Sequence, residues 1–158
     1  MNIEFDTLYD RFASGPDELA SMIQGLTEQQ MDAVPIEGRW SIRQVVAHLA
    51  DFEIINCERM KRIIAEDNPS FFDADPNLFE RALQYGHRSV TDELNLIRHI
   101  RNHLLSILRA SDVEVLQRTG VHSSDGPMTL ETLIERTTKH IGHHLKFIQG
   151  KINALTIR

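Results

Sequence analysis

The stretch WSIRQVVAHLADFEIINCERM, Trp40–Met60, contains the clearest helix start in the chain. Ser41 is a good N-cap, and Gln44 three residues later completes a capping box. Trp40, just before the cap, can pack on Val45 as a hydrophobic staple. Apolar residues then recur at helical spacing, so the stretch predicts a long amphipathic helix.

Helical periodicity continues on both sides of this stretch. A first helix is expected over about residues 3–24, where Gly15 and Pro16 should kink or restart it, because proline removes a donor and clashes with the preceding turn. The helix that starts at Ser41 should run to about Glu66, since the Asn-Pro pair that follows favours extended backbone. The capping-box sequence TEQQ just after the first helix suggests a short extra turn.

The second half of the chain predicts two more long helices. One starts at about residue 76 and could reach residue 110, with a break near Gly86. Residues 111–128 are irregular, and within them 113–121 either pair as a short hairpin or cross the bundle. The last helix, capped by Thr129, should reach about residue 152. The sequence therefore predicts an all-α four-helix bundle with long crossover connections.

Composition excludes several classes of protein. At 158 residues the chain predicts a single domain over residues 1–158. A net charge of −6 disfavours a nucleic-acid partner. No segment approaches the roughly 20 apolar residues that span a membrane, and no signal peptide is recognisable, so a cytoplasmic location is expected. The single cysteine, Cys57, excludes an intrachain disulfide and a Cys-rich zinc site.

Three of the eight histidines fall on helix faces that point toward the core. His140 and His144 are four residues apart, so their rings project from one face of the last helix. His48 lies at the edge of the core face of the helix that begins at Ser41. Three imidazoles from two facing helices would hold a zinc or nickel ion and leave coordination positions open.

Chance pairing of histidines is the alternative, and the chain provides its own comparison. His99 and His103 have the same spacing as His140 and His144, but His99 faces away from the core and His103 lies at its flank. That pair is interpreted as surface or as part of a subunit contact. Periodicity alone therefore leaves open whether the other three histidines simply fill the bundle.

Two motifs resemble those of the DinB/YfiT-like superfamily of metal-binding four-helix bundles. Residues 40–60 are similar to its pattern W-S-x-x-[EQ]-x-x-x-H-L-x-D-x-E-x-x-x-x-x-R, and HIGHHLKFI at 140–148 is similar to its H-x-x-H-H segment. The resemblance covers nearly the whole chain. It implies that His48, His140 and His144 bind one divalent metal ion per chain, zinc or nickel.

Other polar residues are candidates for supporting roles. Asp51 and Glu53 could orient a ligand imidazole or a bound water, although exposed carboxylates are an equal alternative. Arg59 could hold a substrate carboxylate or form a structural ion pair. His143 is interpreted as an outer contact of the site or a surface residue. No residue is identified as catalytic beyond the metal ligands.

The resemblance also implies an activity, because members of the superfamily include thiol-dependent transferases and isomerases. The prediction is a metal-dependent thiol S-transferase that uses a low-molecular-weight thiol, such as bacillithiol or mycothiol, and a small-molecule electrophile. Metal-dependent hydrolysis is a close variant. A non-catalytic, stress-associated metal-binding protein and a dimeric interaction module are the alternatives. Apolar residues outside the core stripes favour a homodimer: Leu96, Ile100, Ile107, Phe71 and Phe72.

Overall fold

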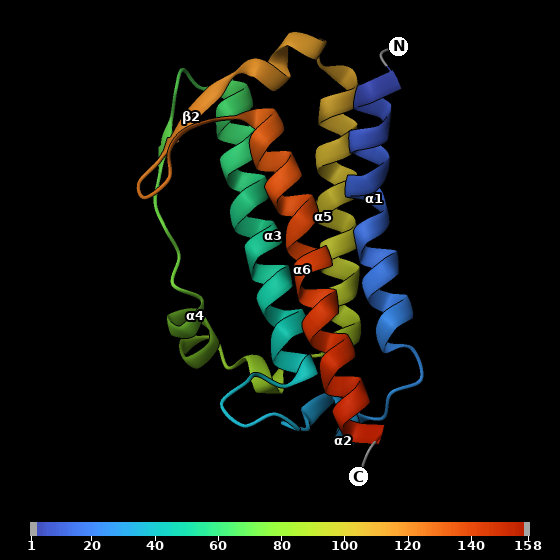
Figure 1. The fold of residues 1–158 in the computed structure, drawn as a ribbon. Helices are drawn as coiled ribbons and strands as arrows, with labels where there is room; N and C mark the ends of the chain where they lie inside the picture. The colour runs from blue at the N-terminus through green and yellow to red at the C-terminus, as the bar shows by residue number, and fades with distance from the viewer. Residues whose placement is uncertain (1–2, 157–158) are drawn as a thin grey trace.

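Four long helices lie side by side in the computed structural model, which describes residues 3–156 (Figure 1). They are α1 (Ile3–Ile23), α3 (Ile42–Ala65), α5 (Val90–Ala110) and α6 (Leu130–Thr156). The connections are long and carry the short helices and a small three-stranded sheet. The predicted four-helix bundle is confirmed, and the sheet is an addition to it.

Two apolar clusters fill the bundle, one toward each end. The first includes Phe12, Met60, Leu104 and Ile134, and the second includes Leu19, Leu49, Ile97 and Ile148. Along the helices, a short polar layer separates these clusters. It consists of an ion pair between Glu53 of α3 and Arg101 of α5, and both side chains are at most 2% exposed.

Arg101 connects all four long helices. Its Nε donates to Glu53 at 3.1 Å, its Nη1 to the Phe12 carbonyl of α1 at 2.6 Å, and its Nη2 to the Thr137 carbonyl of α6 at 3.1 Å. The guanidinium also lies over the Phe12 ring, 4.5 Å from its centroid. A buried charge is tolerated only where such partners surround it.

The sequence predicted a kink or a restart of the first helix at Gly15 and Pro16. The restart is wrong, because α1 runs unbroken through Pro16. In a helix the residue 16 amide would bond the Phe12 carbonyl, and proline cannot supply that hydrogen. Arg101 supplies it instead. Gly15 makes room for the guanidinium, because a Cβ there would lie 2.4 Å from Arg101 Nη1.

Local capping signals are confirmed at both predicted capping boxes. The Ser41 hydroxyl accepts from the Gln44 amide and the Gln44 side chain accepts from the Ser41 amide, which fixes the first turn of α3. Thr27 and Gln30 do the same at α2 (Glu28–Asp32), the expected extra turn. The start of α3 at Ile42 is therefore well defined, six residues before His48.

The region predicted as one helix over residues 76–110 is divided near Gly86, as anticipated. It forms α4 (Pro76–Ala82), the 3-10 helix η1 (Tyr85–His87) and then α5. Gln84 adopts a left-handed backbone with φ of 50°, which a continuing helix does not allow. Ser89 then caps α5 through the Asp92 amide.

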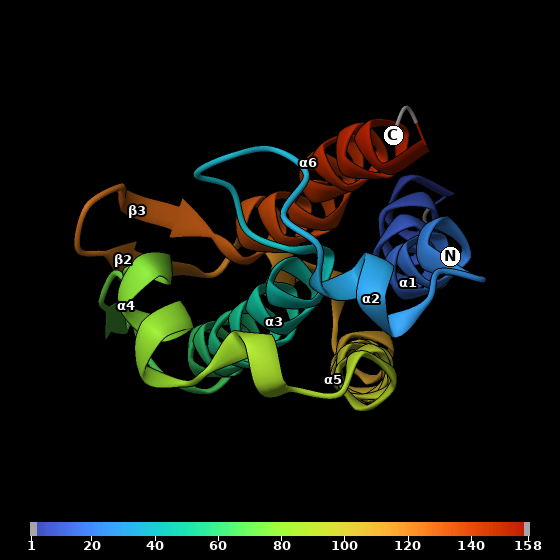
Figure 2. The same ribbon diagram turned by 90° about the horizontal axis from the view of Figure 1, so that it is seen from below.

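The irregular region before the last helix contains a hairpin, but not within residues 113–121. The 3-10 helix η2 (Val113–Gln117) comes first, and β2 (Thr119–His122) then pairs antiparallel with β3 (Gly126–Thr129). The two-residue strand β1 (Ser70–Phe71) adds in parallel to β2. Figure 2 shows this sheet and α4 on the same side of the bundle.

None of the helices within residues 3–156 is both long and apolar enough to cross a membrane. The predicted surface pair is where the sequence placed it, because His99 and His103 are both exposed on α5. Of the two loop phenylalanines, Phe71 is buried beneath the sheet and Phe72 is 80% exposed. The cytoplasmic location, the single domain and the homodimer stay predictions.

Candidate metal centre

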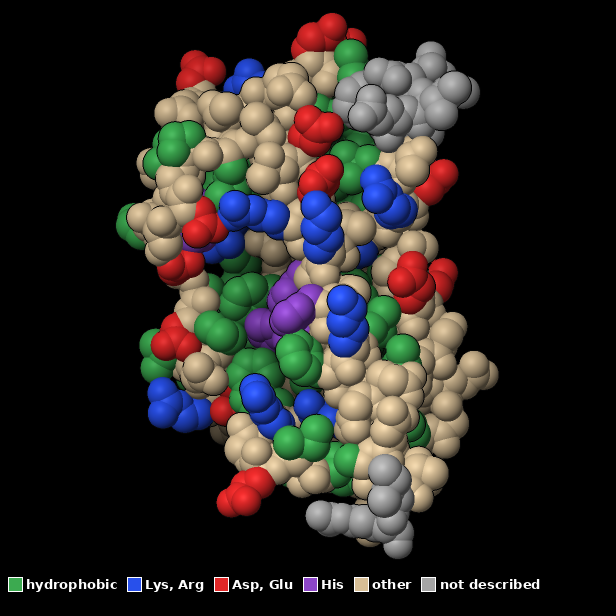
Figure 3. Space-filling model, viewed as in Figure 1, with side chains coloured by type: hydrophobic (Ala, Val, Ile, Leu, Met, Phe, Trp, Pro, Cys, Tyr) green, Lys and Arg blue, Asp and Glu red, His purple; other side chains and the backbone are tan. Residues whose placement is uncertain are grey.

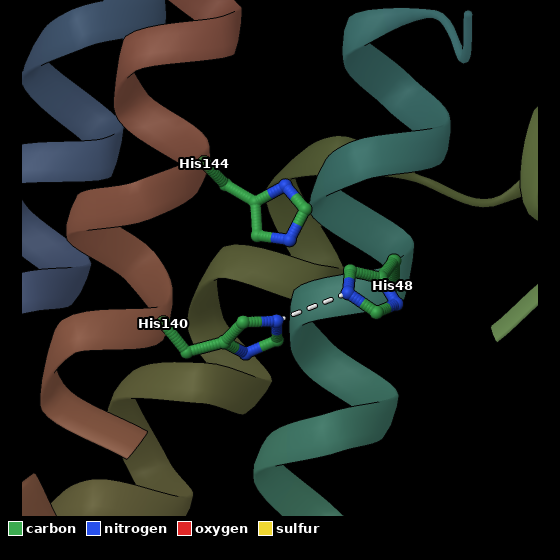
Figure 4. Close-up of side chains that lie close together, drawn as sticks. All are labelled: His48, His140 and His144. Atoms are coloured by element: carbon green, nitrogen blue, oxygen red, sulfur yellow. Dashed lines mark hydrogen bonds between the residues drawn. The ribbon is translucent and has the colours of Figure 1, made fainter. Parts of the chain in front are cut away.

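Three histidines meet between α3 and α6 (Figure 4). His48 projects from α3, and His140 and His144 project from successive turns of α6. One ring nitrogen from each lies within 4.8 Å of the other two. Nε2 of His48 and Nε2 of His140 are 3.1 Å apart. In the part of the chain that the structure describes, no other cluster of histidine, cysteine and carboxylate side chains has this geometry.

Aromatic side chains hold the His48 ring in place. Its centroid lies 4.5 Å from that of Phe52, one turn along α3, and 5.2 Å from that of Trp40. Trp40 precedes the capping box of α3, so the helix start that the sequence predicts also positions one wall of the site. His48 is only 4% exposed, whereas His140 and His144 are partly exposed.

The histidine pKa values are well below the ordinary value. Burial is the main cause at all three, and the neighbouring imidazoles reinforce it. The pKa is lowered to about 3 for His48, about 4 for His140 and about 3 for His144. All three rings are therefore neutral at pH 7, with lone pairs free to bind a cation.

The donor set fits a divalent transition metal. Neutral imidazole suits zinc and nickel, and three protein ligands leave positions for water or a substrate. The facing nitrogens of His48 and His140 lie at a distance that a shared ion or a shared proton would satisfy. Figure 3 shows histidine side chains reaching the surface near the middle of one face, with Lys and Arg side chains around them. His140 and His144 are themselves partly exposed, so a small molecule can reach the site.

Asp51 lies one turn from His48 but is engaged elsewhere. Its Oδ1 accepts from Arg88 at 2.8 Å. Tyr85 packs beside it, and burial together with this carboxylate raises the pKa of the Tyr85 hydroxyl. Nδ1 of His48 has no hydrogen-bond partner among residues 3–156. Asp51 thus supports the packing behind His48 and makes no hydrogen bond to the ring.

Glu53 faces the polar layer and not the triad, because it pairs with Arg101. Burial raises the pKa of Glu53, and Arg101 opposes that shift. The alternative of exposed carboxylates is wrong for both acids, since Asp51 is 7% and Glu53 2% exposed. Their arginine partners come from distant segments, which a helical wheel cannot reveal.

Arg59 is buried beside a cavity of about 400 Å³ that His140 also lines. It donates to the Asn56 side chain at 3.2 Å and to the Phe72 carbonyl. It makes no ion pair with a carboxylate in the described part of the chain. His143 lines the same cavity, is exposed, and packs on Phe147 with centroids 4.8 Å apart. Both residues lie near the triad without joining it.

Sequence reasoning missed a second cavity, of about 250 Å³, on the other side of the triad. His144 lines it together with Trp40, Phe147, Arg39 and Lys151. Lys151 is seven residues beyond His144, two helical turns, and so lies on the same face. That spacing could have identified Lys151 from the sequence. A still larger cavity, about 650 Å³, lies along α3 and α5 and contains none of the three histidines.

A four-helix bundle with three facing histidines on two of its helices defines a class of protein that can hold a metal ion in its core. The chain belongs to the DinB superfamily, whose family model matches residues 11–148. A relative from Oceanobacillus iheyensis, provisionally named a metal-dependent hydrolase, is 29% identical over 133 residues, which is 84% of this chain and 77% of that protein.

Two solved structures share the fold. YfiT from Bacillus subtilis, described as a probable metal-dependent hydrolase with an unusual four-helix bundle topology, superposes with a TM-score of 0.90 at 22% identity, over 99% of this chain and 90% of YfiT. A mycothiol-dependent maleylpyruvate isomerase superposes with a TM-score of 0.69 at 13% identity, over 89% of this chain and 58% of the isomerase. At these identities the likeness concerns the fold.

Proposed function

We propose that His48, His140 and His144 bind one divalent metal ion, zinc or nickel, and that the protein is a metal-dependent hydrolase. The observation that carries the proposal is the convergence of three imidazole nitrogens within 4.8 Å. The provisional name of the curated relative supports the same activity. A bound ion would supply Lewis acidity and lower the pKa of a water or thiol placed on it.

The chain's own residues supply binding and orientation. The low pKa values keep the triad neutral, so protons do not compete for its nitrogens near pH 7. Phe52 and Trp40 pack on His48 and fix the orientation of its ring. Cavities on the sides of His140 and His144 give a substrate two approaches.

Thiol S-transfer is the second candidate, and the two cavities favour it. Hydrolysis needs one organic substrate, whereas transfer from a low-molecular-weight thiol to an electrophile needs two. The cavity at His140 and the cavity at His144 could each hold one reactant. The fold likeness to a mycothiol-dependent enzyme is compatible with this candidate.

Metal content tests the site directly. Untagged protein, analysed by elemental mass spectrometry, should contain about one zinc or nickel per chain, a stoichiometry fixed by one three-ligand site. His48→Ala and His144→Ala should lose the metal. His103→Ala is the matched control, because this exposed histidine lies outside the triad. Folded wild-type protein that retains no metal under saturating zinc and nickel would contradict the proposal.

Activity then separates the candidates. Metal-loaded protein is assayed with chromogenic esters and amides, and with thiols plus electrophiles. Metal-dependent release from the esters or amides without a thiol supports hydrolysis. Strictly thiol-dependent turnover supports the transferase. A stoichiometric metal without turnover in either panel would favour a non-catalytic metal-binding protein.

A further inference from the structure

The cavity beside His144 contains an unusual lysine. Lys151 is 4% exposed, yet its ammonium group has no hydrogen-bond or ion-pair partner within residues 3–156. Burial, and then the nearby Arg39, lower the pKa of Lys151. The ammonium is not among the fully buried polar atoms that lack a partner, so it reaches the solvent of the cavity, where no carboxylate of the described residues balances its charge.

Other buried cations of the chain have oxygen partners. Arg43 bonds the carboxylates of Glu28 and Asp32, and Arg101 bonds Glu53. Arg59 donates to a backbone carbonyl and an amide oxygen. Lys151 differs from all of these, because it shares its cavity with the aromatic rings of Trp40 and Phe147 and with a second cation, Arg39.

The cavity that His140 lines, on the opposite side of the triad, contains cations that are paired with carboxylates. There Lys139 pairs with Glu135 at 2.7 Å, and Arg136 pairs with Asp125. Arg59, which also lines that cavity, pairs with no carboxylate of the described residues but donates to the Asn56 side chain and the Phe72 carbonyl. Of these two cavities beside the triad, the one at His144 has two cations, Lys151 and Arg39, for which the described residues provide no carboxylate partner.

Helix geometry directs Lys151 toward the triad. It lies two turns after His144 on the same face of α6, about 10 Å further along the helix at 1.5 Å per residue. Long side chains on a helix lean toward its N-terminus, so the Lys151 side chain is expected to lean back toward His144. The Lys151 charge is accordingly one of the causes that lower the His144 pKa.

We propose that this cavity binds the anionic group, a carboxylate or phosphate, of the substrate that reacts at the triad. Lys151 and Arg39 contact the anion, and the Trp40 and Phe147 rings contact the apolar part of the same molecule. The reactive group of the substrate is then within reach of His144. The link to catalysis rests on the proposed metal site, but anion binding itself does not.

Trp40 provides the measurement, because it is the only tryptophan of the chain and lines the cavity. Its fluorescence is quenched with iodide, an anion, and with acrylamide, which is neutral, at constant ionic strength. Removing the charge in Lys151→Met should lower the iodide quenching constant about two- to fivefold, a change expected for one nearby charge. Acrylamide quenching should not change.

Matched variants isolate the charge at this position. Lys146→Met removes an exposed lysine from the same helix and should quench like wild type. Lys151→Arg keeps the charge and should retain the iodide preference. Equal iodide quenching in wild type and Lys151→Met would overturn the proposal.

Binding of defined anions identifies the ligand chemistry. Benzoate, acetate and inorganic phosphate are titrated against wild type and Lys151→Met, and the Tm is recorded. A Tm increase restricted to wild type supports the site, and the anion that gives it distinguishes carboxylate from phosphate. No increase with any of the three would count against it. The same titrations in His144→Ala show whether anion binding survives when the metal site fails, so that the two proposals are tested separately.

Discussion

Arg101 donates to the Phe12 carbonyl, at 2.6 Å, the hydrogen bond that Pro16 cannot donate. The arginine on α5 therefore satisfies the carbonyl that the proline within α1 leaves without its helical hydrogen bond. The same guanidinium pairs with Glu53 on α3 and bonds a carbonyl of α6. The helices that carry the triad are thus tied together by a single side chain.

Arg101→Met should destabilise the protein by about 3–5 kcal/mol, because Glu53 would remain as a buried, unpaired acid. Urea denaturation of the metal-free protein measures the change. Arg98→Met is the matched control on the same helix: its pair with Asp17 is exposed, so we expect a loss of about 1 kcal/mol or less. Similar losses in the two variants would refute the role assigned to Arg101.

Gly15→Ala should also destabilise, by about 1–3 kcal/mol, since the new Cβ would displace the Arg101 guanidinium from α1. Gly150→Ala on α6 is the comparison. A Cβ at Gly150 would meet no neighbouring side chain within 4 Å, so the change should stabilise by about 0.5–1 kcal/mol through helix propensity. Thermal unfolding should give a lower Tm for Gly15→Ala and a higher Tm for Gly150→Ala. A higher Tm for both variants would contradict the close approach of the Arg101 guanidinium to Gly15.

The metal-free protein should lose stability as the pH falls from about 6.5 toward 4. The folded triad has pKa values of about 3 to 4, whereas unfolded histidines titrate near 6.5. Between these values the unfolded chain binds protons that the folded chain does not, which favours unfolding. We expect a loss on the order of a few kcal/mol between pH 7 and pH 5.

Urea midpoints at pH 7 and pH 5 check this dependence. A variant in which His48, His140 and His144 are all replaced by glutamine serves as the control. Its stability should change much less over the same interval. A wild-type protein whose stability is as insensitive to pH as that of the variant would show that the three rings are not buried as described.

Nickel should quench the fluorescence of Trp40, whose ring centroid is 5.2 Å from that of His48. Zinc lacks unpaired electrons, so it should bind without comparable quenching and should restore the emission when it displaces nickel. Titration of the metal-free protein measures both effects. His48→Ala should abolish the nickel response, and quenching that persists in that variant would place the ion elsewhere.

Signals that depend on neighbouring residues were predictable from the sequence, and those that depend on distant partners were not. The capping boxes at Ser41 and Thr27 act within one turn, and the histidine triad follows helical spacing. The continuity of α1 depends on Arg101, far along the chain. The strands are two to four residues long, too short for an alternating pattern to be recognisable.

Asp51 and Glu53 show the same limitation within the site. The sequence placed Asp51 one turn from His48 and Glu53 on another side of the helix. It could not show their partners, because Arg88 follows η1 and Arg101 lies on α5, outside the wheel of α3. Both carboxylates therefore stabilise the bundle around the triad. A prediction of their role required knowing which helices face one another.

Because His140, His144 and Lys151 all project from α6, their separations are set by an uninterrupted helix and not by flexible loops. One residue inserted between His144 and Lys151 would rotate the lysine by about 100° around the helix axis, out of the cavity. Molecules that contact both groups must therefore match a fixed length. Homologues that keep both histidines but alter this interval should select substrates of a different size.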